Sequence, residues 1–387
     1  QFSKDKLMKC ELVSRLTDID KTDWDSLNKS NHPFTSYDFL NSLEISESVS
    51  SKTGWSPQHI IVKNDKGNIV GASPNYLKMH SYGEYIFDHA WANAFENAGG
   101  QYYPKLLSAI PFTPATGPRV LIDPKNPENN KIFELIINMF EIIVQNNNLS
   151  SAHINFITDN LNNKLKNEKW IKRKGLQFHW HNKDYSSFDD FLSKLKSSKR
   201  KAIRKERRNI LNNNLVIQKV TGVELNNEIW DSFYDFYLNT IDKKWGGAYL
   251  TKSFFYLINK TMKNKILLII ARQNNKIVAG ALNFIGNNTL YGRNWGSIVD
   301  IPFLHFELCY YQAIEYAINN NIKTVEAGAQ GHHKIQRGYV AETIYSSHFI
   351  QNKSFARAVR NFVELESEEI EKQIELINQQ GSPYSNI

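Results

Sequence analysis

An internal repetition is the feature of this sequence that most constrains its fold. HIIVKNDKGNIVGASPNYL at 59–77 and LIIARQNNKIVAGALNFI at 268–285 each read as a β-branched strand, a polar turn and a second strand. FELIINMFEIIVQNNNLSSAHINF at 133–156 and FELCYYQAIEYAINNNIKTVEAG at 306–328 each read as an apolar-periodic helix, an asparagine-rich stop and a strand. The same order occurs twice, so we expect two similar α/β halves, each with a mixed sheet.

The first copy is the longer one. The hairpins are offset by 209 positions and the helix–strand pairs by 173, which leaves about 35 extra residues in the first copy. This segment, 85–120, is rich in aromatic residues, Pro and Gly, and long ordered segments of this kind are more often functional than plain connectors. We predict a first domain at 8–183 with this insertion, a second domain at 184–387, and a C-terminal helix that ends near Gly381.

Composition excludes several classes of protein. With 387 residues, 41% of them hydrophobic and 12% aromatic, the chain is long enough for two folded domains and is not a disordered protein. Its longest strongly apolar run, 266–271, is far shorter than the roughly 20 residues that a membrane helix needs. Two cysteines favour a reducing compartment, so we expect a cytoplasmic protein, or one from an organelle interior in a eukaryote.

One short segment carries the whole net charge of +8. Between Lys194 and Arg208 there are nine Lys or Arg and one acid, Glu206, and the rest of the chain has 38 basic and 38 acidic residues. At 100° per residue, one side collects the apolar positions Leu192, Leu195, Ala202, Ile203 and Ile210. This pattern predicts an amphipathic helix with a cationic face that contacts RNA phosphates, an anionic membrane surface or a phosphorylated substrate, and the alternative is a solvated face. The predicted polyanion-binding residues are Lys199, Arg200, Lys201, Arg204, Lys205, Arg207 and Arg208.

Several blocks in fixed order resemble one family. They are TGWSPQHI (53–60), DHAWANAFENAGGQYYPKLLSAIPFTPATGPRVL (88–121), SSKRKAIRKERR (197–208), LYGRNWG (290–296), LHFELCYYQAIEYAI (304–318) and EAGAQGHHKIQRGY (326–339). Together they resemble the FemAB-like N-acyltransferases, proteins of peptidoglycan biosynthesis or recognition, from about Met8 to Phe355.

The resemblance implies a tandem pair of GNAT-like domains that moves an acyl or aminoacyl group onto a small-molecule or peptide amine. Fem-type enzymes take the amino acid from aminoacyl-tRNA, which would give the basic segment an RNA role. The glycine-spaced loop that holds the pyrophosphate of acyl-CoA in GNAT enzymes is lacking in WGSIVDIPFLHF at 295–306 and in KNPENNKIF at 125–133. We therefore expect no resident cofactor, with acyl-CoA or aminoacyl-tRNA as the co-substrate, and the missing loops favour a Fem-like donor or a lost activity over acyl-CoA bound in the ordinary way.

The strand TVEAGA carries a carboxylate among apolar neighbours. Buried alone, Glu326 would be costly, so it is expected to pair with Arg293 or Arg337 or to face a cleft. Amine acyl transfer needs a proton acceptor, and the candidates for the catalytic role are Glu326, His333 and His305. A purely structural Glu–Arg bridge is the alternative.

The stretch GAQGHHKIQRGY follows this strand. Gly328 and Gly331 allow a tight turn whose N–H groups could face an oxyanion or phosphate, and two cations follow three positions apart. The substrate-binding candidates here are Arg293, Trp295, Gln330, Gly331, Lys334 and Arg337, with surface charge as the alternative. No metal is expected, because the His-x-Glu at 305–307 lacks the Pro-Cys-x-x-Cys partner of the zinc deaminases.

The insertion mixes aromatic rings with cations. Trp91, Tyr103 and Lys105 are substrate-binding candidates for a sugar, nucleobase or peptide, although the prolines also fit a rigid packed lid. A non-catalytic module that recognises a glycan, a peptide or an anionic head group is the alternative to the transferase.

Overall fold

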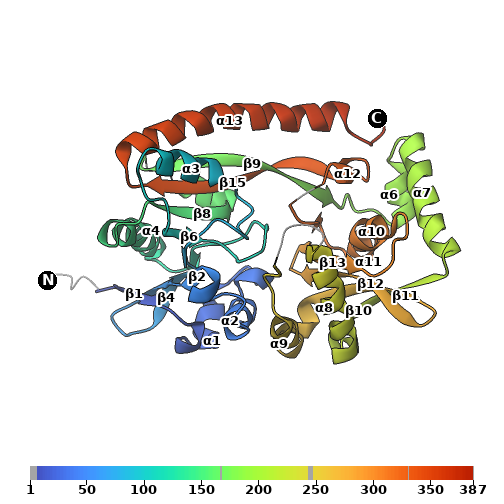
Figure 1. The fold of residues 1–387 in the computed structure, drawn as a ribbon, viewed down its shortest axis with the longest axis horizontal. Helices are drawn as coiled ribbons and strands as arrows, with labels where there is room; N and C mark the ends of the chain where they lie inside the picture. The colour runs from blue at the N-terminus through green and yellow to red at the C-terminus, as the bar shows by residue number, and fades with distance from the viewer. Residues whose placement is uncertain (1–6, 166–167, 243–246, 330, 387) are drawn as a thin grey trace. The chain divides into compact units, whose positions relative to one another are not determined.

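The computed structural model describes residues 7–165, 168–242, 247–329 and 331–386, and these form two compact units (Figure 1). Unit 1 comprises 1–175 and 344–370, and unit 2 comprises 176–343 and 371–387. Three elements have residues in both units: β9 Trp170–His181, β15 Val340–Ile350 and α13 Lys353–Gln380.

Unit 1 is a mixed α/β unit. Its other strands and helices are β1 Lys9–Val13, α1 Lys21–Leu27, α2 Tyr37–Ile45, β2 Trp55–Pro57, β3 His59–Lys63, β4 Ile69–Ser73, β5 Tyr76–Lys78, α3 His89–Asn97, β6 Lys105–Ser108, β7 Leu121–Ile122, α4 Asn129–Asn146, β8 Ser151–Ile157 and α5 Asp159–Lys164. One sheet has the order β1-β3-β4-β7, and the other strands run in the order β15-β8-β6-β5-β2. The β6–β8 pair is parallel, and α4 lies between these two strands in sequence.

The core of unit 1 forms under α4. Ile132, Ile136, Phe140 and Val144 recur every fourth residue, so they share one helix face, and all four are buried. They pack with the apolar residues of β3, β6 and β8 in one core cluster. Gly71 on β4 permits this approach, because a Cβ there would lie 2.5 Å from the side chain of Ile132.

Unit 2 repeats the plan. Its elements are α6 Phe188–Ser193, α7 Ser197–Asn212, β10 Leu215–Thr221, α8 Asn227–Asp242, α9 Lys252–Met262, β11 Ile266–Gln273, β12 Lys276–Ile285, β13 Thr289–Ser297, α10 Leu304–Phe306, a π-helical segment Glu307–Tyr311, α11 Gln312–Asn319, β14 Thr324–Glu326 and α12 His332–Ile335. The sheet order is β10-β11-β12-β13-β14-β9, and only the β13–β14 pair among these strands is parallel within the described residues. Its core buries β11, β12 and the helix that runs from α10 through α11.

In unit 2, β14 pairs with only the first part of its parallel neighbour β13. The ladder between β13 and β14 ends at Tyr291 and Glu326, whereas the ladder between β13 and β12 continues to Ser297. At Gly292 a Cβ would lie 3.2 Å from the carbonyl oxygen of Glu326, so a small residue lets the two chains pass closely here. The segment after Glu326 therefore leaves the sheet next to residues 292–297, the part of β13 that lies beyond its ladder with β14.

The predicted mixed α/β architecture is confirmed. The two expected hairpins are β3–β4 and β11–β12, and each expected helix–strand pair is present, as α4–β8 and α10 through β14. The domain limits of 8–183 and 184–387 remain a prediction, because the compact units divide the chain differently at β9, β15 and α13.

Two local expectations were wrong. The insertion 85–120 is not only a loop, because it supplies α3 and the sheet strand β6. The basic segment is not one helix, because it is interrupted at Lys194–Lys196 between α6 and α7, and Ala202 is exposed rather than on the apolar face. Within the described part of the chain, none of the helices combines the length and the apolar character that a bilayer crossing requires.

Candidate functional site

A cluster of acids and histidines lies where β14 pairs with β9 in unit 2. Glu326 stands directly opposite His179 in this antiparallel ladder, and the Nε2 of His179 lies 2.9 Å from Oε1 of Glu326. The other ring nitrogen, Nδ1, lies 2.8 Å from Oε2 of Glu342 on β15, and that carboxylate also contacts His181. We call Glu326, His179, Glu342 and His181 the acid–histidine cluster.

Strand alternation explains the cluster. Trp180 and Val325 face the opposite side and pack into the core of unit 2, so their neighbours His179 and Glu326 must share the other face. Glu326 was expected to pair with Arg293 or Arg337 or to face a cleft, and within the described residues its ion pair is with His179. This partner was not predicted, because it comes from a strand about 150 residues earlier, which local periodicity cannot reveal.

The acid–histidine cluster raises the pKa of His179. Burial lowers the pKa of His179, but its hydrogen bonds with Glu326 and Glu342 outweigh this and bring the pKa to about 9. For Glu342, burial raises the pKa, and the bonds from His179 and His181 outweigh that effect and lower it to about 2. At neutral pH His179 is therefore protonated, between the carboxyl groups of Glu326 and Glu342. Solvent reaches the cluster at Glu342 and His181, whose side chains are 34% and 35% exposed.

Lys334 lies under the glycine turn that follows Glu326. Its side chain is fully buried, and its Nζ donates a hydrogen bond to the carbonyl of Gly328 at 3.0 Å. A Cβ at Gly331 would meet the Lys334 side chain at 2.7 Å, so Gly331 lies directly against the lysine. Burial lowers the pKa of Lys334 to about 8, and attraction to Cys309 and Glu326 only partly offsets this. An amine with such a pKa exists in both protonation states near neutral pH, as proton transfer requires.

Ring contacts bring the other predicted residues of unit 2 together. The ring of His305 lies 5.0 Å from that of Trp295, and its neighbour Phe306 lies 5.5 Å from the ring of His333. Arg337 stacks on Phe306, with its Cζ 3.6 Å from the ring centroid. Three blocks of sequence predicted to form one site, on β13, α10 and α12, therefore meet around Phe306.

Arg337 is committed to internal bonds. Its guanidinium donates to Glu206 at 2.8 Å, to the hydroxyl of Tyr311 at 2.9 Å and to the carbonyl of His333 at 2.7 Å. Its side chain is 9% exposed. Arg337 was predicted to hold an anionic ligand, and the structure instead shows it as a link between α7, the π-helical segment and α12. Gln330, another predicted contact, lies outside the described residues, and Arg293 on β13 is half-buried.

The basic helix α7 divides its cations between solvent and core. Arg207 faces inward, where it forms a forked ion pair with Glu307 at 3.0–3.2 Å and stacks on Phe188. Arg200 is half-buried and donates to the carbonyl of Leu195 at 2.9 Å, and Lys199 is also half-buried. The exposed cations of the predicted set are Lys201, Arg204, Lys205 and Arg208. The cationic face is thus present on α7, but Arg207 belongs to the interior.

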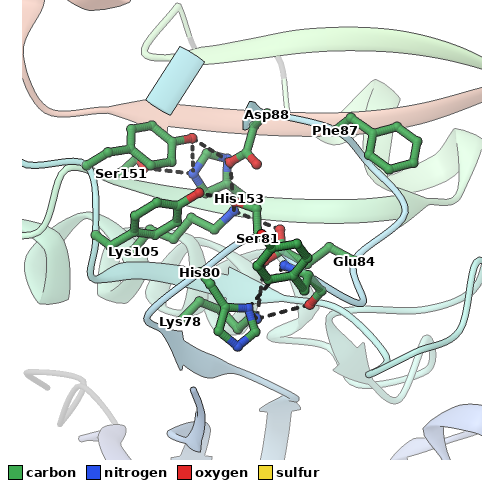
Figure 2. A network of polar contacts seen from close by, with 12 residues as sticks. Lys78, His80, Ser81, Glu84, Phe87, Asp88, Lys105, Ser151 and His153 are labelled. Atoms are coloured by element: carbon green, nitrogen blue, oxygen red, sulfur yellow. Dashed lines mark hydrogen bonds and ion pairs between the residues drawn. The ribbon is translucent and has the colours of Figure 1, made fainter. Parts of the chain in front are cut away.

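A second polar network, in unit 1, contains Lys105, one of the candidates from the insertion (Figure 2). Lys78 on β5 and Lys105 on β6 stand directly opposite each other in the ladder, and both are fully buried. Glu84 resolves this like-charge pair, since one of its oxygens lies 2.7 Å from Nζ of Lys105 and the other 3.4 Å from Nζ of Lys78. Lys105 also donates to Asp88 at 2.6 Å and to Ser81 at 2.8 Å.

The two lysines differ in charge. Burial lowers the pKa of Lys78 to about 7, whereas for Lys105 the pull of Asp88 and Glu84 exceeds the effect of burial and raises the pKa. Lys105 was predicted to contact substrate, but here it is buried and bonded to three side chains. Trp91 is likewise buried, while Tyr103 is half-buried and its hydroxyl lies 2.7 Å from Oγ of Ser81.

The network continues through buried histidines. The Tyr102 hydroxyl donates to Asp88 at 2.5 Å, and His153 and His348 share one hydrogen bond of 2.6 Å between their Nδ1 atoms. Burial and the charge of Lys105 lower the pKa of His153 to about 3, so the imidazole is neutral at physiological pH. A connected polar network of this kind holds the insertion in one conformation, and we assign it a structural role.

Sequence reasoning missed three residues of the acid–histidine cluster. His179 and His181 occur two apart in the strand sequence LQFHWHN, and Glu342 occurs in YVAETIY. Polar residues two apart on a strand with large apolar residues between them indicate a polar face, so the histidines carried a signal that could have been read. No signal in the sequence indicated that these residues cluster with Glu326.

The sequence of this chain matches a known protein family. The chain matches the model of the FemAB-like family, described as peptidoglycan biosynthesis/recognition, over residues 15–386. No protein in the curated set matches it.

Solved structures share the fold at low sequence identity. FemX is 12% identical with a TM-score of 0.55, and the match covers 88% of this chain and 98% of FemX. L-PGS from Bacillus licheniformis is 8% identical with a TM-score of 0.53, and the match covers 89% of this chain and 97% of that one. A tandem GNAT protein from the clavulanic acid pathway is 8% identical with a TM-score of 0.47, covering 88% and 98% of the two chains. By the family match over nearly its whole length, the chain belongs to the FemAB-like family.

Proposed function

We propose that this protein is an N-acyltransferase that moves an acyl or aminoacyl group onto the amine of a small molecule or peptide, with aminoacyl-tRNA as the donor. The observation that carries the proposal is the buried Lys334, whose pKa is about 8 and which is attracted by Glu326 of the acid–histidine cluster. Membership of the FemAB-like family and a fold shared with FemX support it.

The acid–histidine cluster would bind the acceptor as its ammonium ion. The pKa of Glu342 is lowered to about 2, so its carboxylate is ionised at neutral pH, and the side chain is 34% exposed to solvent. A cation drawn to Glu342 would be desolvated on one side and placed toward the end of β14. This role replaces that of general base for Glu326, since its Oε1 is already engaged with His179.

Lys334 would then remove the proton that blocks attack. In its neutral form Nζ accepts a proton from the acceptor ammonium, and the freed amine attacks the carbonyl carbon of the donor ester. A C–N bond forms, the ester C–O bond breaks, and the ribose oxygen of the tRNA leaves with a proton. An aliphatic ammonium has a pKa of roughly 10.4, so its proton transfer to Lys334, whose pKa is about 8, is uphill by about two units and is driven by attack of the freed amine on the ester.

The donor would dock on α7. Its exposed Lys201, Arg204, Lys205 and Arg208 suit a polyphosphate backbone, and such contacts bind without sequence specificity. His305, Trp295 and His333, gathered around Phe306, would line the path of the acyl group in the same unit.

The test is transfer of label in a defined mixture. Unfractionated tRNA charged with radiolabelled amino acids is incubated with a lysine-containing peptide and the purified protein, and label in the peptide is counted. We expect transfer by the wild type and a loss of about 100-fold or more in Lys334→Met, since a positioned base contributes roughly 10²–10⁴. The affinity for tRNA should stay within about twofold, because Lys334 is buried away from the exposed cations.

Lys334→Arg is the matched control variant. Arginine keeps the positive charge but does not release its proton, so a base at this position predicts that this variant is inactive as well. Activity retained in Lys334→Arg would assign the residue to charge stabilisation. If no transfer occurs with aminoacyl-tRNA or acetyl-CoA while tRNA or peptide still binds, the non-catalytic binding module takes the place of the transferase.

A further inference from the structure

The basic helix α7 and the short helix α12 are joined through one closed set of hydrogen bonds. Glu206 is the single acid among the nine cations of the basic segment. Its Oε1 accepts from Arg337 at 2.8 Å, its Oε2 accepts from the hydroxyl of Tyr311, and that hydroxyl accepts from Nε of Arg337 at 2.9 Å. Each of the three side chains therefore bonds the other two.

This triangle is well shielded. The side chains of Glu206 and Arg337 are 14% and 9% exposed, and Tyr311 is fully buried. Charge-assisted hydrogen bonds in such surroundings are among the stronger ones, and their fixed geometry restricts the elements that carry them. The neighbouring residue, Arg207, ties α7 to the same π-helical segment through Glu307.

Arg337 passes the restraint on to the turn above Lys334. Its NH1 donates to the carbonyl of His333 at 2.7 Å, one residue before Lys334, and its backbone N–H donates to the carbonyl of Lys334 at 3.0 Å. The Lys334 side chain in turn reaches Gly328 at 3.0 Å. A displacement of Arg337 would therefore also displace Lys334.

We propose that Glu206 and Arg337 are positioning residues that hold Lys334 in its buried place from the helix that receives the donor. The inference rests on the proposed function for its catalytic meaning, but the positioning itself is a property of the resting protein. It also accounts for the presence of one acid in a helix that otherwise gathers cations, since a glutamine could not form the ion pair.

The experiment follows Lys334 directly. Intact protein is trace-labelled with acetic anhydride between pH 6 and 10, and mass spectrometry measures the labelling of Lys334. In the wild type we expect a low rate with a midpoint near 8. In Glu206→Gln we expect the rate at saturating pH to rise by about fivefold or more and the midpoint to move upward, because a loosened α12 exposes the amine to water.

Variants at both ends of the pair separate positioning from folding. Arg337→Ala should behave as Glu206→Gln does, and Arg337→Lys, which keeps the charge, should restore part of the wild-type profile. The exposed Glu224→Gln is the control for loss of an acid and should leave the profile unchanged. Binding of heparin should change by less than about twofold in Glu206→Gln, as it removes no cation.

The outcomes are decisive without any turnover. A wild-type labelling profile in both Glu206→Gln and Arg337→Ala would overturn the positioning role, even if the protein proves to be a transferase. A changed profile in a protein that shows no transfer would leave the positioning intact and count against the proposed function alone.

Discussion

At the scale of single residues, Lys334 and His179 have opposite pKa shifts although both are buried in unit 2. Lys334 donates to the carbonyl of Gly328 and is attracted by Cys309 and Glu326, but burial outweighs this attraction and its pKa falls to about 8. His179 lies between two carboxylates in direct contact, so attraction prevails and its pKa rises to about 9. The distance to a counter-charge, rather than burial itself, decides the direction.

The shift at His179 predicts how stability depends on pH. Because the folded pKa of about 9 exceeds the ordinary value of 6.5, the stabilisation is complete below pH 6.5 and is lost as the pH rises through 9. For Glu342 the folded pKa is lowered to about 2 from 4.5, so its stabilisation is lost as the pH falls through that window. The cluster should therefore stabilise the fold most between about pH 4.5 and 6.5.

Urea denaturation of the wild type and of His179→Gln at matched pH measures this effect. The difference in free energy of unfolding should shrink by at most about 3 kcal/mol between pH 6 and 10, from the 1.36 kcal/mol that each pKa unit represents. A difference that stays constant over this range would show that His179 is not protonated in the folded state.

At the scale of elements, the basic residues of α7 differ in their surroundings: some contact the interior and others face solvent. Its register places Arg207 toward the core, where Glu307 and Phe188 receive it, while Lys205 two residues earlier faces solvent. Helical periodicity forces this division, since residues two apart point about 200° apart around the axis.

Lys205→Gln should therefore weaken binding of a polyanion through phosphate contacts alone. In a titration with tRNA or heparin at several salt concentrations, the slope of log affinity against log salt should become shallower by roughly 0.7–0.9. Lys260→Gln removes the same charge from the exposed side of α9 and should leave the slope unchanged. Equal effects of the two variants would mean that net charge, rather than α7, governs the binding.

At the scale of the whole molecule, both units contain polar networks built across strand ladders. In unit 2 the acid–histidine cluster lies across the β14–β9 ladder, and in unit 1 the lysine pair with Glu84 lies across the β5–β6 ladder. Both arise where polar residues face each other across a ladder, so a single lost partner leaves a buried charge without compensation.

The lysine pair provides a matched test of that statement at pH 8. Lys105→Met leaves Glu84 and Asp88 without their main cation and should cost about 3–5 kcal/mol of stability. Lys78→Met should cost much less, because Lys78 has a pKa of about 7 and is mostly neutral at this pH. Thermal unfolding of the two variants compares them, and equal losses would show that both lysines are fully charged.

The sequence by itself determined the architecture and the order of the elements. Hairpins, helices and strands follow from local periodicity, and alternation along a strand such as TVEAGA puts Glu326 and Val325 on opposite faces, as in the structure. The same local pattern identified the cationic face of α7 and the blocks that resemble the FemAB-like family, which the family match confirms.

The partners of the charged side chains depend on tertiary packing and could not be predicted from the sequence. Glu326 meets His179, Glu342 reaches a histidine 163 residues away, and Arg337 forms an ion pair with Glu206. These contacts depend on which strands become neighbours and in which register, and that is set by the packing of the whole unit. Periodicity tells which way a side chain points, but the group that it meets there comes from a distant part of the chain.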